Sequence, residues 1–254
     1  MAGAKWTAGA KWTAGAMRSA RATIRAIDRC GVGMAEDDGL LGRVKRKLVD
    51  SKEKWAREGR LLTALGGKGA RTRLPPGQRP VKNWPVLDLG VQPDIDLERW
   101  ELVVDGLVEN KLSWNWADWR NLPHTRMVTD IHCVTAWSRY DNRWDGVPAR
   151  HILDLTRPLP EAKHILFHGL DGYTTNLPLA AFADPDVIFA DGWEGEPITP
   201  HHGGPVRVVV PQRYFWKSAK WICRLEFLAE DKPGFWEVRG YHNAGDPWRE
   251  ERYG

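Results

Sequence analysis

The stretch TDIHCVTAWS, residues 129–138, places a cysteine at the end of a strand-like run in a chain of 254 residues that has three cysteines. The run Arg126–Val134 carries the apolar pattern of a half-buried strand. A buried thiol at the end of such a strand can pack as a small hydrophobic group, attack a substrate or bind a metal. The remaining sequence has to discriminate among these three uses of Cys133.

A nucleophilic cysteine needs a base, and its neighbour His132 is poorly placed for that role. Adjacent residues of a strand point to opposite faces of a sheet, so the imidazole would face away from the thiol of Cys133. As a thiolate, Cys133 would suit a thiophilic metal. One protein ligand does not hold a metal ion, and no Cys-x-x-Cys pair is present. A metal at Cys133 would therefore have to arrive within a cofactor.

The composition is that of one sizeable domain, with 42% hydrophobic residues and a net charge of +4 distributed over interspersed charges. No recognised nucleic-acid-binding motif is visible, which argues against a nucleic-acid partner. No apolar run approaches the roughly 20 residues that cross a bilayer, and the N-terminus lacks the apolar region of a secretory signal. We therefore expect a cytoplasmic protein without a membrane span.

Three parts follow one another along the chain. Residues 1–33 contain AGAKWT twice in tandem and then an Arg-rich stretch, and we predict a disordered extension because so short a repeat builds no solenoid. Residues 34–80 contain apolar residues at every seventh position from Leu41 to Leu62, typical of an amphipathic helix, and then the proline-rich connector RTRLPPGQRP. The main domain is expected over residues 81–254.

The main domain is predicted to be α+β, mixed and mostly β. Regular alternation of strands and helices is missing, and no GxGxxG or Walker motif is present, which argues against a doubly wound nucleotide-binding fold. Turns are expected at Asp105-Gly106, Asp145-Gly146, Asp171-Gly172, Asp191-Gly192 and Glu194-Gly195. The predicted strands are Glu101–Asp105, Arg126–Val134, His164–His168, Val187–Ala190, Val206–Pro211 and Lys220–Leu228. The predicted helices are Trp114–Arg120, with Ser113 as N-cap, Pro148–Leu155 and Pro178–Phe182.

A second stretch with side chains that could bind a ligand is HHGGPVRVVVPQRYFWKSAKWI, residues 201–222. Its two glycines would let the backbone approach a ligand closely. Arg207 precedes an apolar run, and a buried guanidinium demands an anionic partner. Ser218 and Lys220, with Lys217 close by, would form a phosphate clamp. The alternative is an ordinary solvated basic loop.

Four segments in this order, DIHCVTAWS, ILFHGLDGYTTNLPLAAF, ADGWEGEPI and HHGGPVRVVVPQRYFWKSAKWI, resemble the molybdopterin-binding domain of the sulfite oxidase family. The resemblance extends over residues 81–228. The closing segment GYHNAGDPWREERYG is similar to the small, soluble bacterial branch of sulfite oxidase-like oxidoreductases. The resemblance implies a sulfite oxidase-type fold and a molybdenum–molybdopterin cofactor.

The resemblance also implies roles for individual residues. Cys133 would be the protein thiolate on molybdenum, and Tyr173 would match an active-site tyrosine of sulfite-oxidising members. Asn83, in VKNWPV, would match an early pterin-contacting segment. The family binds the pterin and its phosphate at the positions of His202, Arg207, Ser218, Ala219 and Lys220.

Two departures from the sulfite-oxidising members concern charge. The segment after Cys133 carries the lone Arg139 in place of paired arginines, and Lys82 stands where those members have another arginine. A sulfite dianion is bound best by several fixed arginines, so these departures argue against sulfite as the substrate. No haem-binding motif is present either. We therefore expect no haem and an external electron donor or acceptor protein.

The sequence thus predicts a molybdenum-cofactor oxidoreductase that transfers an oxygen atom, with two electrons, to or from a small substrate such as a sulfite-like anion or a sulfoxide. Two alternatives stay open. One is a non-catalytic molybdopterin-binding subunit. The other is a metal-free thiol enzyme that uses Cys133.

Overall fold

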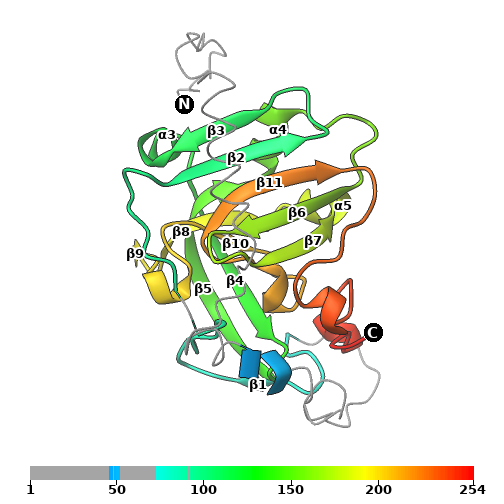
Figure 1. The fold of residues 1–254 in the computed structure, drawn as a ribbon. Coiled ribbons are helices and arrows are strands. Elements are labelled where there is room, and N and C mark those ends of the chain that lie inside the picture. The colour runs from blue at the N-terminus through cyan, green and yellow to red at the C-terminus, as the bar shows by residue number, and fades with distance from the viewer. Residues whose placement is uncertain (1–45, 48, 52–72, 91) are drawn as a thin grey trace, which may run out of the picture.

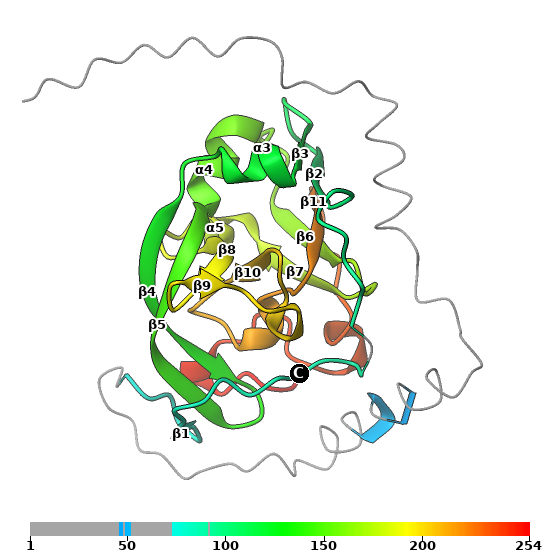
Figure 2. The ribbon, with the colours of Figure 1, turned by 90° about the vertical axis from the view of Figure 1, so that its left-hand side faces the viewer.

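The computed structural model describes residues 46–47, 49–51, 73–90 and 92–254. Two β-sheets face each other, and two of the short helices, Trp116–Arg120 and Ala149–Thr156, lie at one end (Figures 1 and 2). The strands are β1 (Arg79–Pro80), β2 (Glu101–Gly106), β3 (Leu112–Asn115), β4 (Thr125–Cys133), β5 (Trp137–Pro148), β6 (His164–Gly169), β7 (Thr174–Pro178), β8 (Ile188–Trp193), β9 (Glu196–Pro197), β10 (Arg207–Val209) and β11 (Ile222–Leu228). The α-helices are α3 (Trp116–Arg120), α4 (Ala149–Thr156) and α5 (Leu179–Phe182). The 3-10 helices are η1 (Pro200–His202), η2 (Phe215–Lys217), η3 (Glu237–Arg239) and η4 (Pro247–Arg249).

Both sheets are mixed. The six-stranded sheet has the order β1-β5-β8-β10, with β4 paired to β5 and β9 to β8. The five-stranded sheet has the order β3-β2-β11-β6-β7. The pairs β1–β5 and β2–β11 are parallel, and the other pairs are antiparallel. The predicted class, mixed and mostly β with few short helices, is therefore confirmed.

The six-stranded sheet is buried on both faces, because alternate residues of its central strands enter two different cores. On β8, Phe189 packs in the core between the two sheets, whereas Ile188 and Ala190 pack in the second core. The second core lies between this sheet and the segments 84–89 and 214–241. Period-two alternation along β8 and β10 thus decides which side chains face that second core, where the candidate site lies.

The predicted strands all occur, with ends shifted by a few residues, but the longest strand, β5, was not predicted from the sequence. The predicted turns at Asp145-Gly146 and Asp191-Gly192 are wrong: these residues lie inside β5 and β8, side by side. A Cβ atom on Gly146 would lie 2.1 Å from the carbonyl oxygen of Phe189, so the glycine permits close strand contact and marks no turn.

The N-cap predicted for the first helix is also wrong. Ser113 lies within β3, paired with Val103, so it is not available as a cap. The helix begins later, and the side chain of Asn115 accepts a hydrogen bond from the backbone N–H of Asp118 at 2.8 Å. The other two predicted helices occur as α4 and α5, each preceded by its proline.

The predicted extension over residues 1–33 lies outside the described residues, as does most of the helix predicted between residues 41 and 62; positions 46–47 and 49–51 are helical. The connector is extended near residue 79, where β1 pairs with β5. Within the part of the chain that the structure describes, no helix is both long enough and apolar enough to span a bilayer.

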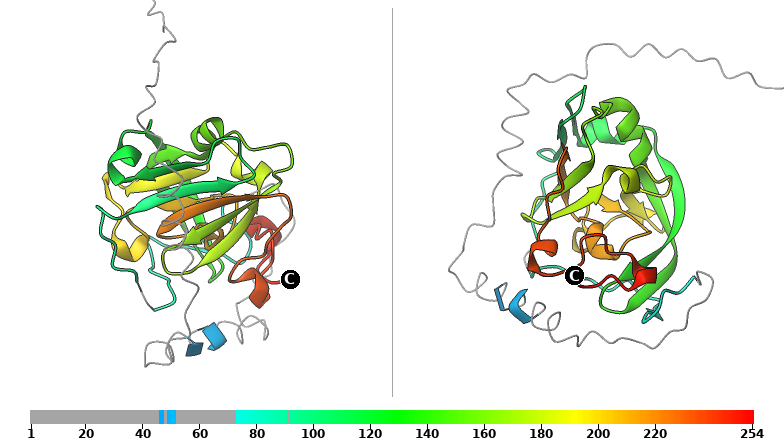
Figure 3. Two further views of the ribbon diagram at one scale, coloured as in Figure 1. Left: turned by 45° about the horizontal axis from the view of Figure 1, so that its top comes forward. Right: turned by 90° about the vertical axis from the view of Figure 1, so that its right-hand side faces the viewer.

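The C-terminal segment, orange to red in Figure 3, returns to the ends of β4 and β5. The guanidinium of Arg252 donates a hydrogen bond to the carbonyl oxygen of Val134 at 2.7 Å. The ring of Trp248 packs edge-on against His132, with centroids 5.0 Å apart. These contacts place the last residues of the chain beside the cysteine-bearing end of β4.

Candidate active site

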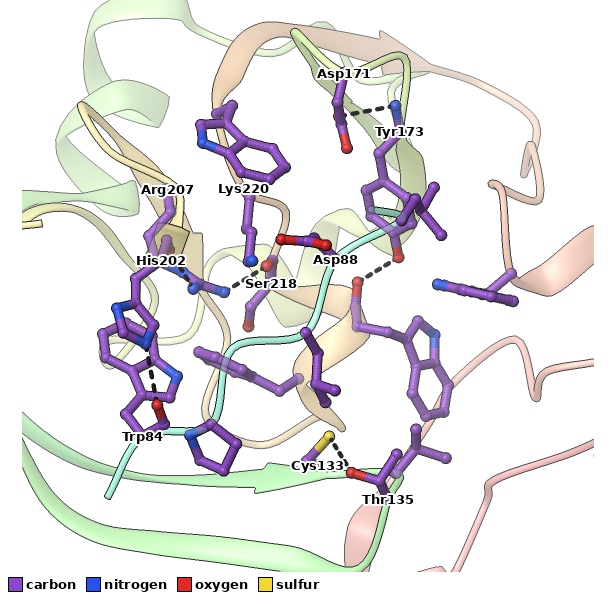
Figure 4. A pocket seen from close by; sticks show the side chains of 18 of the residues that line it. Trp84, Asp88, Cys133, Thr135, Asp171, Tyr173, His202, Arg207, Ser218 and Lys220 are labelled. Carbon is purple, nitrogen blue, oxygen red and sulfur yellow. Dashed lines mark hydrogen bonds between the residues drawn. The ribbon is translucent and has the colours of Figure 1, made fainter. Parts of the chain in front are cut away.

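A cavity of about 220 Å³ opens beside the second core, and Figure 4 shows its lining. Its walls come from segments far apart in the sequence: residues 84–89, the β4–β5 turn, the β6–β7 turn, η1, β10 and the loop before β11. The cavity brings together six of the eight site residues that the sequence predicts, namely Cys133, Tyr173, His202, Arg207, Ser218 and Lys220.

Cys133 is the last residue of β4, and its thiol is not in a disulfide. Its side chain is 5% exposed and belongs to the second core. The sulfur atom lies 3.2 Å from the hydroxyl oxygen of Thr135, within the tight turn that leads to β5. The carbonyl oxygen of Cys133 accepts a hydrogen bond from the Gln78 amide at 3.0 Å. The connector and the turn therefore hold the thiol at the cavity wall from two sides.

His132 faces away from the thiol, as the strand geometry predicts. Its Nδ1 lies 2.8 Å from the hydroxyl oxygen of Ser138, and the ring is 1% exposed. Burial lowers the pKa of His132 to about 4, so the ring is neutral at physiological pH. His132 does not line the cavity, so it is not placed to deprotonate Cys133.

Arg207 begins β10 on the cavity side of the sheet. Its backbone pairs with Ala190, and its side chain is 1% exposed. The guanidinium donates to the carbonyl oxygens of His202 at 2.6 Å and Ser218 at 2.9 Å, and it lies over the Phe215 ring at 4.2 Å. Burial lowers the pKa of Arg207 to about 9, which leaves it charged at neutral pH. These partners are neutral, so within the part of the chain that the structure describes no carboxylate contacts the guanidinium directly.

His202 lies next to Arg207 and is held on both ring nitrogens. Nε2 is 3.1 Å from the carbonyl oxygen of Trp84, and Nδ1 is 3.0 Å from the hydroxyl of Thr199. A neutral ring that donates from Nε2 and accepts at Nδ1 satisfies both contacts. The imidazole stacks on Trp84 with centroids 4.0 Å apart, and burial lowers the pKa of His202. His202 thus presents a flat, uncharged ring to the cavity.

The loop before β11 supplies Ser218 and Lys220. The Ser218 hydroxyl accepts a hydrogen bond from the backbone N–H of Val210 at 3.0 Å, and Lys220 Nζ donates to the carbonyl oxygen of His201 at 2.7 Å. Gly203, at φ +103°, lies where a Cβ atom would be 2.8 Å from Cβ of Lys220. The close approach expected at this glycine is therefore made to Lys220 and not to a ligand.

A model of the family described as oxidoreductase molybdopterin binding domain matches residues 89–236, more than half of the chain. The chain belongs to this family. The chain is thus homologous to molybdopterin-binding oxidoreductases.

Three relatives illustrate the range of this family. An uncharacterized oxidoreductase, YuiH of Bacillus subtilis, is 44% identical over 71% of this chain and 92% of its own length. A putative protein-methionine-sulfoxide reductase subunit, YedZ1 of Azospira oryzae, is 30% identical over 60% of this chain and 58% of its own length. The protein-methionine-sulfoxide reductase catalytic subunit MsrP of Campylobacter jejuni is 26% identical over 57% of this chain. The chain spans 58% and 54% of the lengths of YedZ1 and MsrP.

The side chains of the cavity fit the cofactor that gives the molybdopterin family its name. A buried guanidinium without a carboxylate partner is costly unless an anion joins it, and the phosphate of a pterin cofactor would be that anion. The hydroxyl of Ser218 and the ammonium of Lys220 line the same part of the cavity (Figure 4). The thiol of Cys133, across the cavity, is a ligand type that molybdenum accepts.

Lys217 does not lie with Ser218 and Lys220, the two residues of the predicted phosphate clamp. Its side chain is completely buried and forms an ion pair with Glu237, Nζ to Oε1 2.7 Å. It also donates to the Asn176 side-chain oxygen at 2.8 Å. The expectation that Lys217 stands close to the phosphate clamp is therefore wrong, because η2 turns this side chain into the interior, toward the C-terminal segment.

Tyr173 lines the cavity, but its hydroxyl is engaged with the protein. It donates a hydrogen bond to the carbonyl oxygen of Trp216 at 2.7 Å. Burial, helped by the nearby carboxylates of Glu237 and Asp171, raises the pKa of Tyr173 well above its usual value. The phenol is therefore neutral, and it has lone pairs left to accept a hydrogen bond from a ligand.

Two predicted cofactor residues do not reach the cavity lining. Asn83 is exposed, and the wall is formed instead by its neighbour Trp84. Ala219 is buried, and its carbonyl oxygen accepts a hydrogen bond from the backbone N–H of Val208 at 2.9 Å. Any contact of Ala219 with a ligand would therefore be indirect.

Several wall residues escaped the sequence analysis. Asp88, Asp171, Trp236 and Tyr241 line the cavity together with Thr135. The turn signal Asp171-Gly172 marked the position of one of them but not its exposure to the cavity. The two aromatic residues come from the C-terminal segment, where tryptophan and tyrosine are so frequent that neither stands out.

Proposed function

We propose that this chain catalyses two-electron oxygen-atom transfer on a small substrate, with a molybdenum–molybdopterin cofactor whose metal is bound by Cys133. When bound, that cofactor supplies the two-electron redox chemistry and the metal. The observation that carries the proposal is the pairing, in one cavity, of the Cys133 thiol with the buried guanidinium of Arg207, whose hydrogen bonds go to neutral carbonyl oxygens.

The protein's own contribution is to hold and orient. Arg207, Ser218 and Lys220 bind the anionic tail of the cofactor through charge and hydrogen bonds. The ring of His202, stacked on Trp84, offers a flat surface for a ring system. The neutral phenol of Tyr173 keeps its proton at the hydroxyl oxygen, where it can accept or donate near the substrate.

The metal-free thiol enzyme receives less support. Such an enzyme needs a base within hydrogen-bonding reach of Cys133. His132 lies on the opposite face of β4, and both nitrogens of His202 have partners elsewhere. Among the described residues, no group of three or more histidine, cysteine or acidic side chains could hold a metal ion directly.

The test is metal and pterin analysis of the full-length protein from a molybdate-fed host, with a Cys133→Ser variant beside it. We expect about one molybdenum and one pterin per chain in the wild type. Cys133→Ser should retain pterin, because Arg207 and Lys220 are intact, and should lose turnover. A wild type without molybdenum would refute the proposal, and full turnover by Cys133→Ser would refute the role of the thiol.

We also propose that electrons come from or go to a separate protein, and that this chain carries no haem. One relative is described as a subunit, which supports an electron partner. A visible spectrum of the purified protein tests the absence of haem, since a Soret band would contradict it. A cytoplasmic location stays a prediction.

A further inference from the structure

The charged side chains of the described cavity lining balance one another. Arg207 and Lys220 are its cations, and Asp88 and Asp171 are its carboxylates. His202 is neutral because burial lowers its pKa. The net charge of this lining is therefore close to zero before any ligand binds, and a phosphate-bearing cofactor would make it negative.

Both cations lie away from the thiol. In Figure 4, Arg207 and Lys220 lie in the upper part of the cavity together with Ser218, and Cys133 lies at the lower edge beside Thr135. Their hydrogen bonds hold them there: Arg207 to the carbonyl oxygens of His202 and Ser218, and Lys220 to that of His201. On the proposed function, these two cations are used by the cofactor.

The surroundings of Cys133 are apolar. Seven residues line the cavity and belong to the same buried cluster as the thiol: Trp84, Leu89, Val134, Trp137, Trp216, Trp236 and Tyr241. The rings of Trp236 and Tyr241 pack together with centroids 4.9 Å apart. Tyr241 and Cys133 thus share one cavity wall and one buried cluster.

The cations that the sequence offers near this end are turned elsewhere. Arg139 donates to Glu194 at 3.2 Å and lies over the Trp193 ring at 4.6 Å. Neither Arg139 nor Lys82 lines the cavity. An oxyanion at the thiol would therefore meet apolar side chains and aromatic faces, and among the described residues that line the cavity beside the thiol none is a cation that could compensate its dehydration.

We propose that the reacting substrate is an uncharged molecule with an apolar body, and that sulfite-like and nitrate-like oxyanions are excluded. This inference rests on the proposed function. In the reducing direction, an uncharged S-oxide takes up two electrons and two protons and gives a thioether and water. The electrons come from two molecules of a one-electron donor such as a reduced viologen, and the protons come from solvent.

The first arm of the test is kinetic and uses full-length protein of measured molybdenum content. We expect kcat/KM for methyl phenyl sulfoxide, with reduced viologen, to exceed that for sulfite, with ferricyanide, by at least 100-fold. A kcat/KM for sulfite equal to or above that for the sulfoxide would overturn the inference.

The second arm is a binding titration followed by tryptophan fluorescence, and it does not need the metal. The probes are methyl phenyl sulfone, which is neutral and unreactive, and inorganic phosphate. In cofactor-free protein we expect both to bind, with the Kd of each changed less than 2-fold by the other. Competition between them, or no binding of the sulfone, overturns the inference. If the protein from a molybdate-fed host contains no molybdenum and the cofactor-free protein binds both probes independently, the proposed function is refuted and the inferred substrate class stays intact.

A matched pair of variants tests whether a cation added to the cavity wall improves the turnover of sulfite. Leu87 lines the cavity, is 40% exposed and therefore tolerates substitution. We expect Leu87→Arg to raise kcat/KM for sulfite by about 10-fold and Leu87→Met to leave it unchanged. Equal sulfite kinetics in both variants would show that charge does not limit access of the anion.

Discussion

The hydroxyl oxygen of Thr135 lies 3.2 Å from the sulfur of Cys133, so the β4–β5 turn supplies a hydrogen-bond partner to the proposed metal ligand from only two residues away. A hydroxyl that donates to a metal-bound thiolate weakens electron donation by the sulfur. Thr135→Val should therefore lower the midpoint potential of the metal by tens of millivolts, on the order expected for one hydrogen bond. A redox titration followed by electron paramagnetic resonance measures this potential. Thr135→Ser should retain the wild-type value, and an unchanged potential in Thr135→Val would contradict the role.

Replacement of Arg207 should weaken cofactor binding. The guanidinium is the buried cation of the cavity, and the loss of a charged contact to a buried phosphate costs about 2–5 kcal/mol. Arg207→Ala should thus lower pterin and molybdenum content per chain. The matched control is Arg126→Ala, which removes a guanidinium that is 92% exposed and outside the cavity. Full cofactor content in Arg207→Ala would show that the phosphate is held elsewhere.

The buried pair Lys217–Glu237 should matter for stability. Removal of one partner of a buried ion pair leaves an uncompensated charge and costs about 3–5 kcal/mol. Lys217→Met should lower the free energy of unfolding by this amount, measured by urea denaturation. The double variant Lys217→Met/Glu237→Gln should recover part of the loss, since the amide oxygen can still accept from the indole N–H of Trp216, which lies 3.0 Å from Oε1. A double variant less stable than Lys217→Met would contradict this account.

The free energy of unfolding should depend on pH through Glu226 on β11 of the five-stranded sheet. The His168 ring and the Arg224 guanidinium hold the pKa of Glu226 at about 2, below its usual value of 4.5. A carboxylate with a lowered pKa stabilises the fold above about pH 4.5, and this contribution is lost as the pH falls toward 2. Glu226→Gln should therefore cost about 1–3 kcal/mol at pH 7 and progressively less below pH 4.5. Chemical denaturation at several pH values measures the difference, which a pH-independent loss would contradict.

The apolar strands of the fold could be predicted from the sequence, and the polar one could not. Strands such as β6, HILFHG, show the expected apolar run. β5 reads WSRYDNRWDGVP, and its polar residues hide a strand that is held mainly by pairing with β4 on one side and β8 on the other. Pairing with neighbours is a tertiary effect, and a local pattern does not contain it.

The candidate site shows the same division. Cys133 and Arg207 could be predicted because they lie in segments that resemble the family, and both line the cavity. Lys217 and Lys220 are three residues apart in an irregular loop, and one enters the interior whereas the other reaches the cavity. Periodicity does not apply there, so the direction of Lys217 depends on the carboxylate of Glu237 and that of Lys220 on the carbonyl oxygen of His201, neither of which the sequence alone places.

The guanidinium of Arg252, 4% exposed, ties the carbonyl oxygen of Val134 to that of Pro76 at 2.7 and 3.4 Å. One side chain near residue 250 thereby fastens the turn that carries the thiol to the connector that precedes the domain. A ribosome makes this residue more than a hundred residues after Cys133, so the wall around the sulfur is incomplete while the intervening chain is being translated. Productive insertion of a cofactor would then have to wait until residue 252 has left the exit tunnel.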